Sequence, residues 1–155
     1  MIKIMFVCHG SICRSPMAEF ILKDMVKKMG IESEFFISSS ATSTEEIWNG
    51  KGNPVYSHAK DELQRHGLSC KGKYAVQLKK SDYDLYDLFI GMDSANIRNM
   101  NYLFMGDPEN KVSKLMDYTE SGGDVDDPWY SDRFDIAYND IYKGCCGLIE
   151  YLLKK

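Results

Sequence analysis

Short apolar runs recur along the chain, separated by stretches in which apolar residues return every three or four positions. Runs of this length, bounded by polar or turn-forming residues, are typical of β-strands. One of them, near the middle of the chain, is almost continuously apolar, as expected for a strand that is covered on both faces. The predicted strands occupy residues 2–7, 34–39, 86–92 and 111–115.

Apolar stripes with helical spacing follow these strands. The first begins after Pro16 and ends near Gly30, which predicts a helix that packs one face against the sheet. Further helices are predicted at 56–66 and 94–103. Strands alternating with helices predict one doubly wound α/β domain over residues 1–155, with its ligand at the carboxyl ends of the strands. The last predicted helix has an apolar face formed by Phe134, Ala137, Ile141, Cys145, Leu148 and Leu152.

The junction between the first strand and the first helix has the most specific pattern in the chain. Cys8 ends the strand, five residues follow, and Arg14, Ser15 and Pro16 open the helix. Ser15 is a preferred N-cap residue, and Pro16 suits the first helical turn. Unpaired backbone N–H groups and the helix dipole favour an anion at such a junction. The sequence therefore predicts a phosphate-binding loop.

The residue types in this loop suit phosphoryl transfer. Arg14 can bind two phosphoryl oxygens with its planar guanidinium, and the positive field of the loop favours the thiolate form of Cys8. A thiolate beneath a phosphate monoester can attack it and form phosphocysteine, and Ser15 can donate its hydroxyl to the sulfur. An ordinary buried cysteine and a surface arginine are the alternative for either residue alone. Their combination in one loop favours the functional interpretation.

The segment CHGSICRSPMAE resembles the phosphate loop of the low-molecular-weight protein tyrosine phosphatases, a family that also includes arginine phosphatases and arsenate reductases. SSSATSTEEI, YDLFIGMD and DDPWY also stand where the family has counterparts, so the resemblance covers nearly the whole chain. It implies a three-layer α/β/α fold of the flavodoxin-like type, with a parallel four-stranded sheet in the order 2-1-3-4. The phosphate-binding loop that it implies consists of Cys8, His9, Gly10, Ser11, Ile12, Cys13 and Arg14.

Such a phosphatase needs an acid that protonates the leaving group and then, as a base, activates water. In the segment DVDDPWY, Asp127 directly precedes Pro128, which restricts it to an extended backbone that can hold the carboxylate over a pocket. The resemblance implies the same choice, because the acid of the family directly precedes proline. Asp126 is the neighbouring alternative, and Asp107 before Pro108 is interpreted as an ordinary turn.

Aromatic residues near this acid predict a deep pocket for phosphotyrosine, whose phosphorus lies farther from the backbone than that of phosphoserine. Trp129 and Tyr130 follow the acid, and Trp48 lies in a polar loop expected at 42–53. Packing is the alternative for each aromatic taken singly. Ile12 favours the same substrate, because arginine phosphatases of the family carry threonine at the matching position. An arginine phosphatase, a small aryl or acyl phosphatase and an inactive phosphate-binding module are the other functions considered.

Two more loop residues carry expectations from the resemblance. Ser11 stands where the family usually has asparagine, which accepts a left-handed backbone and braces the loop, so Ser11 is expected to support the loop. Cys13 stands where phosphatases of the family often carry a second cysteine. We predict that Cys13 condenses with the sulfenic acid of oxidised Cys8 to form a disulfide. The alternative is that Cys13 only packs beneath the first helix.

Composition bears on compartment and partners. A net charge of −4 with scattered basic residues argues against nucleic acid or an anionic membrane as a partner. No apolar stretch approaches the roughly 20 residues of a membrane span, and MIKIMFV is too short for a signal peptide. Five cysteines, with Cys145 and Cys146 adjacent, do not suggest a disulfide framework, so a reducing cytoplasm is expected. The prediction is a monomeric protein tyrosine phosphatase that needs no metal or other cofactor.

Overall fold

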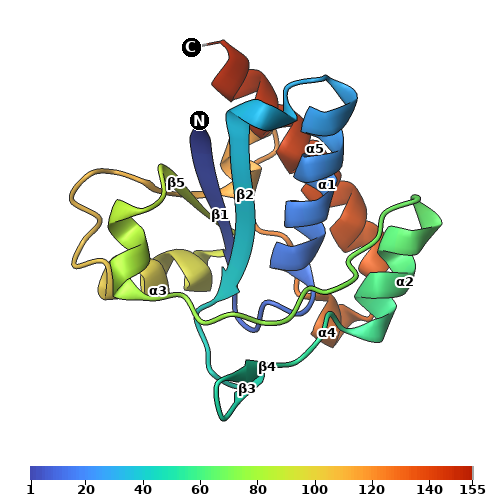
Figure 1. The fold of residues 1–155 in the computed structure, drawn as a ribbon, viewed down its shortest axis with the longest axis horizontal. Coiled ribbons are helices and arrows are strands. Elements are labelled where there is room, and N and C mark those ends of the chain that lie inside the picture. The colour runs from blue at the N-terminus through green and yellow to red at the C-terminus, as the bar shows by residue number, and fades with distance from the viewer. Residues whose placement is uncertain (155) are drawn as a thin grey trace.

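A computed structural model describes residues 1–154 and places a parallel sheet at the centre of the molecule (Figure 1). The spatial order of its strands is β2-β1-β5-β6, which confirms the predicted order 2-1-3-4. The first strand is therefore internal, with a neighbour on each side. The four strands are β1 (Ile2–Cys8), β2 (Phe35–Ala41), β5 (Leu88–Gly91) and β6 (Val112–Lys114).

Helices cover both faces of this sheet, as predicted for a three-layer α/β/α fold. Figure 1 shows α1, α2 and α5 on one side and α3 on the other. In the described part of the chain, none of the helices is long and apolar enough to cross a membrane. Short 3-10 turns occupy Glu32–Glu34, Lys80–Asp84 and Leu115–Tyr118. The α-helices are α1 (Arg14–Lys28), α2 (Ser57–Arg65), α3 (Ser94–Leu103), α4 (Pro128–Ser131) and α5 (Phe134–Leu153).

The first strand is apolar on both faces because it contributes to two separate cores. Ile4 and Phe6 are fully buried and, with Cys8, belong to the larger core, which contains the apolar stripes of α1 and α5. Met5 and Val7 point the other way, into a smaller core that α3 covers. Side chains alternate along a strand, so Cys8 ends β1 on the same side as α1.

The segment 42–53 differs from the irregular loop expected there. It contains a small hairpin, with β3 (Ile47–Trp48) antiparallel to β4 (Lys51–Gly52). Asn49 and Gly50 connect the two strands and have φ values of 50° and 76°. Two successive positive φ values are required by a type I′ turn, the common turn of two-residue hairpins, and asparagine and glycine accept them most readily.

Candidate active site

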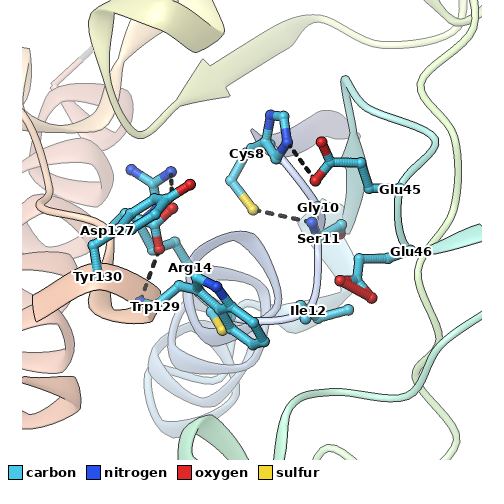
Figure 2. A pocket seen from close by; sticks show the side chains of 12 residues that line it. Cys8, Gly10, Ser11, Ile12, Arg14, Glu45, Glu46, Asp127, Trp129 and Tyr130 are labelled. Atoms are coloured by element: carbon cyan, nitrogen blue, oxygen red, sulfur yellow. Dashed lines mark hydrogen bonds and ion pairs between the residues drawn. The ribbon is translucent and has the colours of Figure 1, made fainter. Parts of the chain in front are cut away.

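The loop between β1 and α1 curls around the sulfur of Cys8. The backbone N–H of Ser11 donates a hydrogen bond to Cys8 Sγ at 3.2 Å (Figure 2), and the N–H of Ser15 donates to it at 3.4 Å. The hydroxyl of Ser15 also lies 3.2 Å from this sulfur. Three polar groups therefore converge on one buried sulfur.

Ser15 was predicted to cap the first helix, and this prediction is wrong. The helix begins two residues earlier than such a cap requires, at Arg14, and the N-cap position is taken by Cys13, which forms no side-chain cap bond. The Ser15 hydroxyl is directed to Cys8 and to Ser11 Oγ, which lies 2.8 Å away. Contact with the thiol and with the loop replaces capping, so the first turn of α1 is held by the site itself.

Arg14 is held rigidly at the other end of the loop. Its Nη1 donates hydrogen bonds to Asp93 Oδ2 and to the carbonyl oxygen of Val125, both at 2.8 Å, and its side chain is only 3% exposed. Burial alone would lower the pKa of Arg14, but the negative charges of Cys8, Asp93 and Asp127 raise it. A permanently charged guanidinium therefore faces the cavity, and within the described residues its Nε forms no hydrogen bond.

Asp93 contacts Arg14 but was not among the predicted site residues. It follows β5 and caps α3, where its carboxylate accepts from the backbone N–H of Asn96 at 2.8 Å while also binding Arg14. Burial raises the pKa of Asp93, but the Asn96 N–H and the Arg14 guanidinium lower it more. A signal was present, because the carboxyl ends of neighbouring parallel strands meet at one edge of the sheet.

Asp127 lies on the same side of the cavity as Arg14 (Figure 2). Its Oδ2 is 3.6 Å from Arg14 Nη2, and its Oδ1 accepts a hydrogen bond from the backbone N–H of Trp129 at 3.0 Å. It thereby caps α4, with Pro128 at the first helical position. Asp126 is exposed and does not line the cavity. Of the two aspartates, only Asp127 lines the cavity.

The cavity above the sulfur has a volume of 130 Å³. Trp129 and Tyr130 line it, and the Trp129 ring packs on Tyr56 with their centroids 4.8 Å apart. Trp48 was predicted as a wall residue, but it lies outside the cavity and its side chain is 80% exposed on the β3–β4 hairpin. The cavity walls consist of Cys8, His9, Gly10, Ser11, Ile12, Cys13, Arg14, Glu45, Glu46, Asp127, Trp129 and Tyr130.

Two glutamates stand where Trp48 was expected, opposite Asp127 (Figure 2). Glu45 Oε2 lies 3.0 Å from His9 Nε2, and both exposed side chains lie at the edge of the cavity. Glu46 accepts a hydrogen bond from the side-chain amide of Asn53 at 2.8 Å. Both glutamates precede the hairpin and line the cavity, whereas Trp48 within the hairpin does not.

Cys13 is buried at the start of α1 and lines the cavity with Cys8. Burial raises the pKa of the Cys13 thiol well above its usual range, and the charges of Cys8 and Asp127 add to this. The loop therefore holds one cysteine surrounded by hydrogen-bond donors and a second that stays protonated. In the part of the chain that the structure describes, no three His, Cys, Asp or Glu side chains are grouped so that they could hold a metal ion.

Comparison with known proteins identifies the family. The sequence model described as "Low molecular weight phosphotyrosine protein phosphatase" matches residues 3–155. The chain belongs to this family. Among curated low molecular weight phosphotyrosine phosphatases, the protein-tyrosine-phosphatase YfkJ of Bacillus subtilis is 34% identical over 157 residues, covering 100% of this chain and 98% of its own length. The Saccharomyces cerevisiae phosphatase is 37% identical over 143 residues, covering 89% of this chain and 86% of its own.

Solved structures of low molecular weight phosphotyrosine phosphatases agree with the fold. The crystal structure of Bacillus subtilis YfkJ superposes with a TM-score of 0.93 at 34% identity, covering 99% of this chain and 96% of the other. SP-PTP, the low molecular weight protein tyrosine phosphatase of Streptococcus pyogenes, gives a TM-score of 0.85 at 35% identity, with 98% and 93% covered. The similarity therefore extends over essentially the full length of both phosphatases.

Proposed function

We propose that this phosphatase hydrolyses phosphotyrosine in proteins, with Cys8 as nucleophile, Arg14 as phosphate clamp and Asp127 as general acid and base. The observation that carries the proposal is the convergence of two backbone N–H groups and the Ser15 hydroxyl on Cys8 Sγ, at 3.2–3.4 Å. Arg14 and Asp127 line the same small cavity. Together they provide a thiolate, a fixed cation and a proton donor around one phosphorus atom.

In the first step, the Cys8 thiolate attacks the phosphorus and the bond from phosphorus to the tyrosine oxygen breaks. Asp127 gives its proton to that oxygen, so the leaving group departs as neutral tyrosine. The guanidinium of Arg14 and the N–H groups of the loop bind the phosphoryl oxygens. Ser11 and Ser15 support the sulfur as their hydrogen bonds strengthen when it carries negative charge.

In the second step, water attacks phosphocysteine on the side from which tyrosine left. Asp127, now ionised, takes a proton from this water as the phosphorus–sulfur bond breaks. The products are inorganic phosphate and the Cys8 thiolate, and Asp127 is protonated again. All protons and electron pairs are returned within the cycle, so the chemistry needs no redox partner and no group beyond these residues.

The walls of the cavity support an aryl phosphate as substrate. Cys8 is only 3% exposed at the floor, while Trp129 and Tyr130 stand half to mostly exposed at the mouth. A phosphorus atom must therefore be carried inward on a long, flat side chain, which tyrosine provides and serine does not. Ile12 adds an apolar surface to the lining of the cavity.

The direct test is hydrolysis of p-nitrophenyl phosphate and of a phosphotyrosine peptide in the presence of EDTA. Phosphoserine and phosphoarginine peptides of the same sequence serve as comparators and should be poor substrates. The Cys8→Ser variant should retain its fold and lose turnover, because an alcohol in this cavity is not ionised at neutral pH. After a rapid acid quench, phosphate should be found on Cys8. Phosphate on another residue, or faster hydrolysis of phosphoarginine, would contradict the proposal.

The free cysteines support a reducing compartment such as the cytoplasm. All five are free, and Cys145 is fully buried in the core on the side of α1, whereas Cys146 is exposed. A thiolate nucleophile is usable only where it stays reduced. Monomeric behaviour stays a prediction, which sedimentation of the purified protein would test.

A further inference from the structure

A second and larger cavity, of 810 Å³, begins where the catalytic cavity ends. Ile12, Glu46 and Trp129 line both cavities. From this shared rim the second cavity, here called the flanking groove, extends between α2 and the segment 69–74. A chain bound with one residue in the catalytic cavity would therefore continue directly into the flanking groove.

The groove is fixed to the phosphate loop by backbone hydrogen bonds. The N–H of Tyr56, at the start of α2, donates to the carbonyl oxygen of Ile12 at 2.9 Å. On the opposite wall, the N–H of Ala75 donates to Asn53 O at 2.8 Å. A Cβ added at Gly52 would lie 1.8 Å from Ala75 O, so only glycine permits this close approach. The groove therefore exists before a ligand arrives.

Three lysines line the groove, and they differ in their partners. Lys73 is engaged internally, because its Nζ lies 3.0 Å from Glu19 Oε1 and donates to Ser39 O at 3.0 Å. Lys60 and Lys71 are exposed, and neither forms an ion pair with a carboxylate of residues 1–154. Two unpaired cations thus face a groove on a chain whose net charge is −4.

Apolar surfaces accompany these cations. Val55 is buried at the base of the groove, and the rings of Tyr74 and Trp129 are 54% and 52% exposed at its edges. Aromatic rings that remain half exposed beside a groove are typical of surfaces that bind polypeptide. The combination fits an extended segment that carries both apolar side chains and carboxylates.

We propose that the flanking groove binds the part of the substrate next to its phosphotyrosine, and that Lys60 and Lys71 select substrates with carboxylates in that part. The inference rests on the function proposed above and names its substrate class more narrowly. Glu46 on the shared rim refines it, since a negative charge there disfavours a carboxylate adjacent to the phosphotyrosine. The selected carboxylates lie farther along the chain, beyond Glu46.

Phosphotyrosine peptides that differ only in one flank test this selection. Each peptide carries a block of three identical residues that begins at the second position from phosphotyrosine and consists of Glu, Gln or Lys. In one series the block precedes the phosphotyrosine, and in the other it follows it. On one flank, kcat/KM should follow the order Glu, Gln, Lys. Exposed ion pairs with two lysines should favour Glu over Gln by about 2- to 30-fold. High salt should reduce this preference, because exposed charges are screened.

The variant Lys60→Glu/Lys71→Glu should reverse the order of the peptides while leaving kcat/KM for p-nitrophenyl phosphate within about twofold. The matched control is Lys27→Glu/Lys143→Glu, which makes the same change in net charge at exposed positions that line neither cavity. That control should retain the preference for Glu. p-Nitrophenyl phosphate has no flanking chain, so its hydrolysis reports only the catalytic cavity.

Two kinds of result would overturn the inference while leaving the phosphatase activity standing. In one, the wild type hydrolyses all peptides of both series with equal kcat/KM. In the other, the Lys60→Glu/Lys71→Glu variant still prefers Glu, or the control loses the preference equally. If neither p-nitrophenyl phosphate nor any phosphotyrosine peptide is hydrolysed, the proposed function fails and the inference fails with it.

Discussion

Replacing Asp127 by asparagine separates its proposed chemistry from its structural role. The carboxylate caps α4 through the N–H of Trp129 at 3.0 Å and lies 3.6 Å from Arg14. Asparagine caps a helix about as well as aspartate, whereas alanine would cost about 1 kcal/mol. Asp127→Asn should therefore leave the free energy of unfolding nearly unchanged while removing the proton that the leaving group needs.

The expected loss of rate depends on the leaving group. A positioned general acid contributes roughly 10²–10⁴-fold, which corresponds to about 2.7–5.4 kcal/mol of activation free energy. Phenyl phosphate should show this loss in full, because phenolate is a poor leaving group. p-Nitrophenyl phosphate should lose much less in its first step, since p-nitrophenolate leaves without a proton. KM should not rise, because the amide is uncharged like the protonated carboxyl group that it replaces in the proposed first step.

The assay is steady-state and single-turnover kinetics of wild type and Asp127→Asn with a series of substituted phenyl phosphates. The slope of log rate against leaving-group basicity should be steeper in the variant. Asp126→Asn is the matched control, because Asp126 is exposed and lies outside the cavity, and it should behave like the wild type. A uniform loss across all leaving groups, or a larger loss in Asp126→Asn, would refute the assignment.

Asp93→Asn should preserve the cap of α3 but remove the ion pair that holds Arg14. Because a hydrogen bond to a charged group is worth about 1.5–3 kcal/mol, inhibition by phosphate should weaken about 10- to 100-fold. An unchanged inhibition constant would contradict this. Burial would raise the pKa of Glu19, but Lys73, Lys23 and Ser39 hold it below its ordinary value. The ionised Glu19 therefore stabilises the folded state fully above about pH 4.3, and this contribution is lost as the pH falls through the lowered pKa. Glu19→Gln should accordingly reduce the free energy of unfolding by about 3 kcal/mol at pH 7. In urea unfolding below the lowered pKa of Glu19, the difference between the variant and the wild type should be smaller. Peroxide should inactivate the enzyme reversibly, with bound phosphate protecting it, and Cys13→Ser should recover far less activity after reduction; equal recovery would remove Cys13 from that role.

The fold was predictable because its strands and helices are strongly patterned. Residues of β1 are apolar on both faces, and the stripe of α1 ends at Gly30, whose φ of 72° is that of a helix-terminating glycine. The hairpin was missed because β3 and β4 have two residues each, too few for a period to appear. Its turn, Asn49–Gly50, was the available signal.

The phosphate loop was predictable from local spacing and the segment of Asp127 from the family resemblance, but contacts between distant segments that carry no motif were not predictable. Cys8, Ser15 and Arg14 lie within one loop, so their spacing alone brings them together. The hydrogen bond from Arg14 to Val125 O spans 111 residues and is accepted by a backbone atom. A backbone acceptor cannot be predicted from residue type. Trp48 was wrongly assigned to the cavity wall, because the presence of an aromatic residue in a loop does not determine whether its side chain faces the cavity or the solvent.

The strained residue of the phosphate loop shows how the loop and its function depend on each other. Ser11 has a φ of 56°, a left-handed conformation that costs a residue other than glycine about 1–2 kcal/mol. In this conformation its N–H reaches Cys8 Sγ, and its hydroxyl lies 2.8 Å from Ser15 Oγ, itself 3.2 Å from the sulfur. A thiolate can only accept, so it directs the Ser15 hydroxyl toward itself, and Ser11 can then donate to Ser15. In the proposed mechanism, a charged Cys8 sulfur therefore orders the two buried hydroxyls that brace the loop, and the hydrogen bonds that offset the strain at Ser11 are strongest in that state.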